Sequence, residues 1–441
     1  MTASFDASTI DQLARQLREP AWLTELRRRA LVQHAALPWP HPSDDIWRRT
    51  DVALLDPVRS QCAPVPPDLL QSLRLTEAQL GTFAQPLGNE HLLVRVNGAW
   101  LANDAPQGLL VEELTRAAET SPGPLRQLLE SNGLTDAEQK LTSLNLAFHH
   151  DDLVVQVPPG WSSDRPVRLV RVVSASAKQA VFPMTVITVG AGSTMTLIDE
   201  AVSVAVDAPG SPHLINARIE LILEPGASVH YVRLQRLDAG AREFLLQRAT
   251  LGRGASLTMA NINLGAALSK AHVVAKLNGE QASTRLYGFV FGHGRQHVDQ
   301  HTLQDHQAPR TTSDLQFRAA LQDQSRMIYT GLIRIGKEAV QTNAYQSNHN
   351  LLLSREARAE TIPMLEILAD DVQCKHGASI GPIDDEQAFY LMSRGVPREA
   401  AERLIVMGFI EPIIQQVPFA PLQERLREEI EGELHQERGS A

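Results

Sequence analysis

The sequence predicts a mainly β protein with helical ends, in which a parallel β-helix forms the core. Three observations carry this prediction. Short β-rich runs begin near residue 153, similar turn-plus-strand phrases recur after it, and no helical pattern of ordinary length interrupts residues 153–368. A β-sandwich is the alternative, but phrases that recur at intervals of roughly 20–50 residues are typical of stacked solenoids.

The N-terminal region is predicted to be helical and then mixed. Apolar residues recur at helical spacing among Arg and Glu over residues 9–18 and 23–37, and a proline-rich turn follows. Trp39 and Trp47, in and just after this turn, are interpreted as local core anchors because aromatic side chains are mostly buried. We assign residues 1–150 to an N-terminal helical and mixed domain.

The recurring phrases define the β-helix core, which we assign to residues 151–380. They read GAGSTMTLID, EPGASVHYVRL and GRGASLTMANINL, each with glycine, a small residue and then alternating apolar and polar positions. Glycine suits the turn, and the alternation suits a half-buried strand. Aligning Gly192, Gly226 and Gly254 gives intervals of 34 and 28 residues.

The chain then becomes helical, and we assign residues 381–441 to a C-terminal helical domain. Asp384 is expected to cap the first helix, and Gly395 is expected to end it. The last helix is rich in charge and is expected to be exposed. The predicted helices span residues 385–394, 397–407 and 422–437.

Composition excludes several classes of protein. The net charge of −10 argues against a general nucleic-acid binder, and no apolar run approaches the roughly 20 residues of a membrane helix. The first residues do not resemble a secretory signal, and Cys62 and Cys374 are the only cysteines, so a reducing cytoplasm is expected. Two cysteines cannot supply the four thiolates of an ordinary iron–sulfur site, so any such cluster needs ligands from another chain.

Cys374 and His376 form the main candidate site. They lie two residues apart at the end of the β-rich region, and an extended backbone would project Val372, Cys374 and His376 from one face. A thiolate beside an imidazole is a plausible half-site for a transition metal. The alternative is that Cys374 is a small buried apolar residue, as lone cysteines often are.

Two weaker motifs are interpreted as structural. His297, Asp299 and His301 would share one face of a strand and could bind a metal, but a polar ladder on the solenoid is favoured, because spacing alone does not converge three ligands. Residues 331–338, GLIRIGKE, nearly match a phosphate-binding loop, but Glu338 replaces the Ser or Thr and no helix follows clearly. No nucleotide is therefore expected to bind this chain.

The sequence resembles the SufB/SufD family of iron–sulfur cluster assembly proteins. The resemblance rests on LEILADDVQCKHGASIGPIDDEQAFYLMSRGV near the C-terminus, on HVDQHTLQDHQAPRTTSDLQFRAAL and QTNAYQSNHNLLLS in the β-rich region, and on residues 22–51. The segment CKHGA, from Cys374, and the shortage of cysteines favour the SufD branch over the SufB branch. Matching is weaker between about residues 60 and 290.

This resemblance implies a right-handed parallel β-helix flanked by N-terminal and C-terminal α-helical regions. It implies a subunit without catalysis that acts with a SufB-like scaffold and a SufC-like ABC ATPase, with a homodimer possible in isolation. The ends of two β-helices would meet and share a transient iron–sulfur cluster or iron, with His376 and, beside it, Cys374 as this chain's ligands. The C-terminal helices, about residues 384–436, would dock the ATPase; the expected contact residues are Asp384, Asp385, Phe389, Tyr390, Arg394 and Gly395.

Two interpretations from other classes stay open at this stage. One is a β-helix carbohydrate-active enzyme, since such folds carry acid and base residues along a solenoid face. The other is a purely structural interaction protein in which His376 and Cys374 are core residues. The second predicts that substituting His376 damages stability, whereas the assembly hypothesis predicts a loss of cluster formation.

Overall fold

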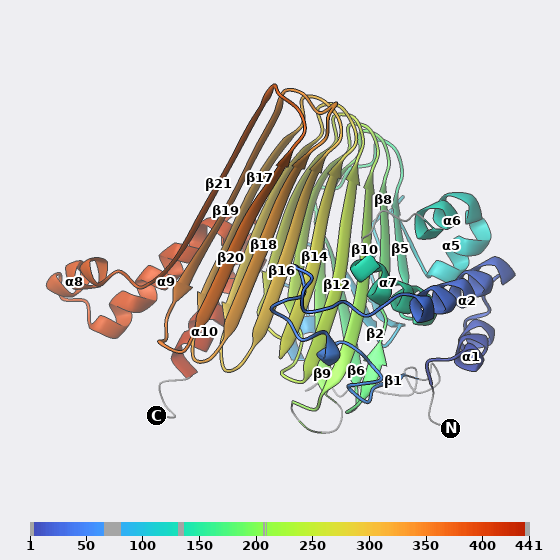
Figure 1. Cartoon of the computed structure of the whole chain (residues 1–441), viewed down its shortest axis with the longest axis horizontal. Helices are drawn as coiled ribbons and strands as arrows, with labels where there is room; N and C mark the ends of the chain where they lie inside the picture. Colours follow the sequence, from blue (N-terminus) through green and yellow to red (C-terminus); the bar gives the residue numbers. More distant parts are fainter. Residues whose placement is uncertain (1–3, 66–80, 131–135, 206–207, 209, 437–441) are drawn as a thin grey trace.

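Two long, mostly parallel sheets wind around a common interior, and helices lie at both ends of the chain (Figure 1). The computed structural model describes residues 4–65, 81–130, 136–205, 208 and 210–436. Consecutive long strands alternate between the sheets, so each neighbour within a sheet lies one turn of the solenoid further along the chain. The predicted parallel β-helix with helical ends is therefore confirmed, and the β-sandwich is excluded.

The first sheet, in spatial order, contains β20 (Arg358–Ile367), β18 (Arg326–Ile335), β16 (His297–His306), β14 (Leu268–Leu277), β12 (Ala241–Leu251), β10 (His213–Leu223), β8 (Met184–Val189), β5 (Leu153–Val157) and β4 (Leu110–Glu112). In addition, β7 (Gln179–Val181) pairs with β10, and β1 (Ala63–Pro64) pairs with β7. The second sheet contains β21 (Val372–Pro382), β19 (Thr342–Leu352), β17 (Thr312–Leu321), β15 (Ser283–Gly292), β13 (Ser256–Asn263), β11 (Ser228–Arg236), β9 (Thr194–Ala205), β6 (Val167–Ala175), β2 (His91–Val96) and β3 (Ala99–Asn103). Strands β2 to β4 thus extend the sheets ahead of residue 151.

The turn glycines explain how the phrases repeat. Gly192, Gly226 and Gly254 have φ angles of 67°, 72° and 63°, a region that favours glycine. Their amides donate to carbonyls one turn further along: Gly192 to Pro225 at 3.0 Å, and Gly226 to Arg253 at 2.9 Å. The aligned glycines therefore stack as successive turns of the solenoid, as the sequence repeat predicts.

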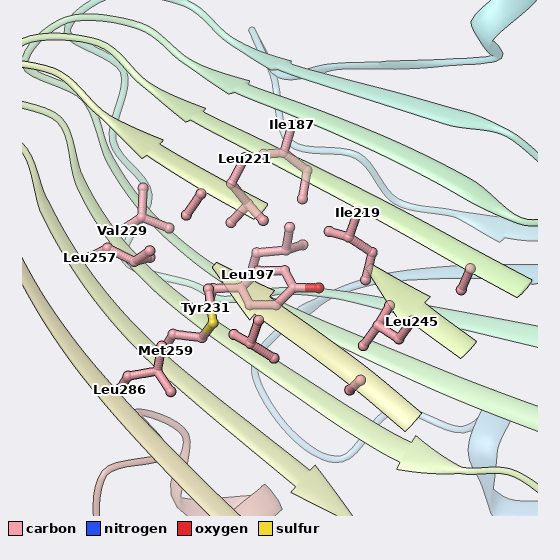
Figure 2. Packing of buried hydrophobic residues seen from close by; sticks show 14 of the residues in the cluster. Ile187, Leu197, Ile219, Leu221, Val229, Tyr231, Leu245, Leu257, Met259 and Leu286 are labelled. Atoms are coloured by element: carbon pink, nitrogen blue, oxygen red, sulfur yellow. The ribbon is translucent and has the colours of Figure 1, made fainter. Parts of the chain in front are cut away.

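Inward-facing side chains fill the interior between the two sheets. Figure 2 shows Ile187, Ile219 and Leu245 from the first sheet facing Leu197 and Met259 from the second. The interior also holds polar groups: the Tyr231 hydroxyl donates to Asp199 Oδ2 at 2.7 Å. Burial and Asp199 together raise the pKa of Tyr231 well above its usual value, so the phenol stays protonated.

Gly288 is a position in this interior where no side chain fits. A methyl group there would come within 2.0 Å of the ring of Phe317, which is itself buried. Gly288→Ala is expected to lower the free energy of unfolding by about 3 kcal/mol, the upper range for overpacking a core. Denaturant unfolding measures this, with Gly123→Ala as control because nothing lies within 4 Å of that position. Equal stability of the two variants would contradict the packing.

N-terminal helices cover the outer face of the first sheet. The short 3-10 turn η2 (Gly81–Ala84) packs instead against the second sheet through Phe83. The helices on the first sheet are α1 (Ala7–Leu17), α2 (Ala21–Ala36), α5 (Leu114–Thr120), α6 (Pro122–Glu130) and α7 (Asp136–Phe148), with the short 3-10 turn η1 (Val52–Leu54). Their apolar residues share a cluster with Phe182 and Phe244 of the sheet side. Trp47 is buried in this cluster and Trp39 packs partly buried against it, which confirms both as anchors.

C-terminal helices cover part of the outer face of the second sheet. They are α8 (Asp385–Ser393), α9 (Arg398–Ile414) and α10 (Ala420–Gln436). Two expectations were wrong here. Helix α9 continues past Met407 and through Pro412, because Ile410, Ile413 and Ile414 are buried in one cluster with the sheet. Helix α10 is not simply exposed: its leucines at 422 and 426 and Ile430 lie in the same cluster, at the spacing of one helix face.

Candidate functional site at the open end of the solenoid

The solenoid ends at a turn that no described residue covers. Strands β20 and β21 are the last members of the two sheet orders, so each has one strand edge without a neighbour (Figure 1). Several large apolar side chains at this end are partly exposed: Leu365, Ile367, Leu368 and Ile380. An edge strand presents unpaired N–H and C=O groups, so this end is suited to pairing with another strand.

Cys374 and His376 both lie on β21 and face the interior side of this last turn. Cys374 pairs in the ladder with Ala344, and His376 pairs with Gln346. Both partners are buried on the neighbouring strand β19. Partners in a parallel ladder share a face, and Gln346 pairs in turn with Leu315 of β17, which lies in the interior core. The expectation that residues 372, 374 and 376 project together is thus met by an extended strand.

The two side chains differ in their surroundings. Cys374 is half-buried against the small apolar cluster that contains Ile333 and Ala344, whereas His376 is exposed at the open end. Burial raises the pKa of the Cys374 thiol. A metal must therefore displace a proton from this thiol before it can bind.

Cys374 and His376 provide two ligands on one face of one strand. Among the described residues, no group of three or more His, Cys, Asp or Glu side chains gathers as a metal site. Four ligands are usual for zinc and for ordinary iron–sulfur clusters. A metal or cluster bound by this pair would need its remaining ligands from a second molecule at the open end.

The polar ladder interpretation of strand β16 agrees with its contacts. Asp299 accepts from Lys270 Nζ of the neighbouring strand at 2.7 Å, and His301 Nε2 lies 2.9 Å from Asp299 Oδ1. Burial lowers the pKa of His301 to about 4, so this ring is neutral near pH 7. The near match to a phosphate-binding loop begins inside strand β18 at Gly331, and the next element along the chain is strand β19 rather than a helix.

Helix α8 carries the other predicted contact residues. Asp384 caps its start by accepting from the Glu386 amide at 2.9 Å, and Gly395 follows its end with a φ of 87°. The Phe389 and Tyr390 side chains are 71% and 58% exposed. Aromatic residues that are this exposed are typical of a protein–protein contact.

Charged side chains surround these aromatic residues. The Arg394 guanidinium lies 5.4 Å from the centre of the Tyr390 ring, a cation–π distance. Asp385 is almost fully exposed, and Arg398 Nη2 lies 3.7 Å from its Oδ1. The six predicted residues thus gather on and beside one short helix whose buried residue is Ala388.

Sequence reasoning missed two parts of these surfaces. Leu365, Ile367 and Ile380 at the open end were not singled out, although Met364 to Leu368, shortly before the last strand, is apolar apart from Glu366. Met392 and Leu404, exposed on α8 and α9, were also missed. Both are apolar residues in predicted helices, and helical periodicity alone does not distinguish an exposed apolar position from a core position.

The fold and this open end define a β-solenoid that presents a cysteine and a histidine at an uncapped edge. A family model described as "SUF system FeS cluster assembly, SufBD core domain" matches residues 172–409, more than half of the chain. The chain therefore belongs to the SufB/SufD family of iron–sulfur cluster assembly proteins. Within the described residues, no helix is both long and apolar enough to cross a membrane.

Several curated proteins are similar along most of their length. The iron–sulfur cluster assembly protein SufD of Bacillus subtilis is 27% identical over 97% of this chain and 98% of its own. A SufBD family protein of Synechocystis is 27% identical over 97% and 96%, and SufD of Escherichia coli is 28% identical over 73% and 74%. These names support the SufD type of assembly protein that CKHGA indicates.

Proposed function

We propose that this chain is a SufD-like subunit of a cytoplasmic iron–sulfur cluster assembly complex, acting with a SufB-like scaffold and a SufC-like ABC ATPase. The observation that carries the proposal is the half-site at the open end. His376 and Cys374 lie on the interior face of the last strand, at the open end of the solenoid, and the edges of β20 and β21 beside them are free to pair with a partner strand.

The cluster, or the iron that precedes it, is cargo held between two chains. His376 offers an imidazole nitrogen as a ligand, and Cys374 becomes a ligand after its thiol loses a proton. The partner supplies the other ligands. In the isolated chain, the same edge pairs two copies into a homodimer, because both copies present the same unpaired strands.

The ATPase binds at α8, and this chain performs no catalysis and binds no nucleotide or nucleic acid itself. Two exposed aromatic side chains and Arg394 form the kind of cluster that dominates binding energy in protein interfaces. Helix α9 joins α8 to the second sheet, so movement of the ATPase passes through α9 toward the end of the solenoid.

His376 also separates the assembly function from a purely structural role. A core histidine would be buried and hydrogen-bonded, whereas His376 is exposed at the open end. His376 is therefore not a buried core residue of this chain. This favours the assembly function over the structural interpretation.

Substituting α8 tests the ATPase contact without removing the C-terminal helices. Deleting residues 384–441 would strip α9 and α10 from the second sheet and expose their shared core, so truncation confuses docking with unfolding. The double variant Phe389→Ser and Tyr390→Ser changes two exposed residues instead. Because each interface hot spot contributes about 2 kcal/mol or more, Kd for the ATPase is expected to rise at least about 100-fold.

The measurement is the native mass and Kd of the chain mixed with the ATPase and the scaffold. Leu101→Ser is the matched control, since Leu101 is 55% exposed but lies on β3 at the other end of the second sheet. ATPase binding that survives the double variant would disprove the α8 dock. Failure of the unmodified chain to bind either protein would overturn the proposed function itself.

A further inference from the structure

A segment near the N-terminus crosses the first sheet and reaches the open end of the solenoid. We call residues 40–51, between α2 and η1, the strap. Trp47 of the strap stacks on Phe244 of β12 with ring centres 6.2 Å apart, and Lys270 Nζ of β14 lies 4.5 Å from the Trp47 ring. Lys270 also donates to the Ile46 carbonyl at 2.7 Å. The buried Trp47 therefore fixes the strap on the middle of the sheet.

The strap continues across the next strands. The Thr50 hydroxyl contacts His297 Nε2 at 3.0 Å and donates to Asp299, both on β16. Asp299 is itself held by Lys270, so the anchor on β14 and the anchor on β16 belong to one buried hydrogen-bond network. Figure 1 shows this N-terminal segment lying across the strands in front of the first sheet.

The last contact of the strap is with the edge strand. Arg49 Nε donates to Glu360 Oε2 on β20 at 2.5 Å, and Arg326 Nη2 of β18 lies 2.5 Å from Glu360 Oε1. One carboxylate on the edge strand is therefore held by the strap and by the neighbouring strand together. Partial burial raises the pKa of Glu360, but the hydrogen bonds from both arginines lower it overall, so the carboxylate is charged near pH 7.

Such a contact matters most at an edge. Among the described strands, β20 has one ladder neighbour. The backbone N–H and C=O groups on its other edge therefore have no strand partner, and the strand can open locally to water. A partner strand binds with less loss of entropy if the edge already has its bound conformation. Glu360 points to the outer side of β20, away from the interior row, so its two arginines do not block the free edge.

We propose that the strap is a clamp that holds edge strand β20 in the conformation required for pairing with a partner's edge strand, with Arg49 as its positioning residue. The occupant of the edge, a second β-solenoid end, rests on the proposed function. The clamp itself is a property of the isolated chain. The N-terminal region thereby contributes to an interface formed by residues more than 300 positions later in the sequence.

Amide hydrogen exchange of the isolated full chain tests the clamp. Arg49→Gln is expected to speed exchange within residues 358–367 by about 5-fold, the upper range for one partly exposed ion pair, and to leave β10 and β12 unchanged. Arg29→Gln is the matched control, because Arg29 also forms a partly exposed ion pair, with Glu130 Oε1 at 2.5 Å, and this pair lies far from β20. Unchanged exchange in β20 would overturn the clamp.

The affinity for the scaffold tests the role in the interface. Arg49→Gln and Glu360→Gln are each expected to raise Kd about 3- to 10-fold, and the double variant to raise it no more than either single variant, since both remove one contact. Faster exchange with an unchanged Kd would overturn the interface role and leave the proposed function standing. A scaffold that binds neither the unmodified chain nor the variants, with faster exchange still seen, would instead overturn the proposed function.

Discussion

Replacing His376 with alanine is expected to abolish cluster formation on the assembled complex while the fold of this chain is unchanged. His376 is exposed on the last strand, so alanine removes no core packing and leaves no buried polar group unpaired. The expected loss is large because, in the proposed site shared between two chains, this chain has no spare ligand and Cys374 alone would remain. We expect cluster content to fall at least about 10-fold, as for the loss of a metal ligand or its support.

Iron and sulfide content of the reconstituted complex measures this effect, and thermal unfolding of the isolated chain shows whether the fold is retained. His349→Ala is the matched control. His349 lies on neighbouring strand β19, where its Nδ1 contacts Ser379 Oγ at 2.7 Å on the outer face of the sheet. Full cluster content in His376→Ala would remove His376 from the site, and a loss of stability without a loss of assembly would support a structural role.

The variant Cys374→Ala tests the contribution of Cys374 separately from that of His376. Its thiol is half-buried, and burial raises its pKa, so the thiolate is less available than an exposed one. Cys374 also packs against Ile333 and Ala344, and alanine keeps part of that contact. Under the proposed assembly function, we therefore expect His376, rather than Cys374, to be the first ligand that meets the partner.

The fold was predictable because its signals are local and repeated. Gly192, Gly226 and Gly254 each occupy a turn with positive φ, and alternation after each glycine encodes a strand with an inner and an outer face. The same alternation placed Cys374 and His376 on one face. A strand period of two residues is a strong signal whether or not the partner strands are known.

The parts that were missed depend on contacts distant in sequence. Helix α9 passes through Pro412 because Ile413 and Ile414 are buried against the second sheet, which outweighs the lost backbone hydrogen bond. Arg49 and Glu360 show no local pattern at all, since 311 positions separate them. Local sequence patterns therefore predict Cys374 and His376, whereas the contact of the N-terminal region with β20 depends on tertiary packing.

Replacing Glu200 with glutamine is expected to lower the free energy of unfolding by about 3–5 kcal/mol at pH 7, the range for breaking a buried ion pair. The Glu200 side chain on β9 is fully buried between two arginines: Arg168 Nε lies 2.9 Å from its Oε1, and Arg236 Nη1 lies 2.9 Å from its Oε2. Arg236 also pairs with Glu429 of α10 at 2.7 Å. Glutamine keeps the shape but leaves the buried arginines short of a negative charge, and it weakens the attachment of α10 to the second sheet.

The pH dependence of this difference follows from the pKa of Glu200. Burial raises that pKa, but Arg236 and Arg168 outweigh burial, so it lies below the usual value of 4.5. A carboxyl whose pKa is lowered by folding stabilises the protein above its unfolded pKa, and this contribution is lost as pH falls through the folded pKa. Denaturant unfolding of Glu200→Gln is therefore expected to differ most from the unmodified chain above about pH 5 and to converge with it in more acidic solution. Glu130→Gln, at an exposed pair with Arg29, is the control and should change stability little at any pH. If the difference between Glu200→Gln and the unmodified chain persists unchanged in acid, then lost packing, and not lost charge, destabilises the variant.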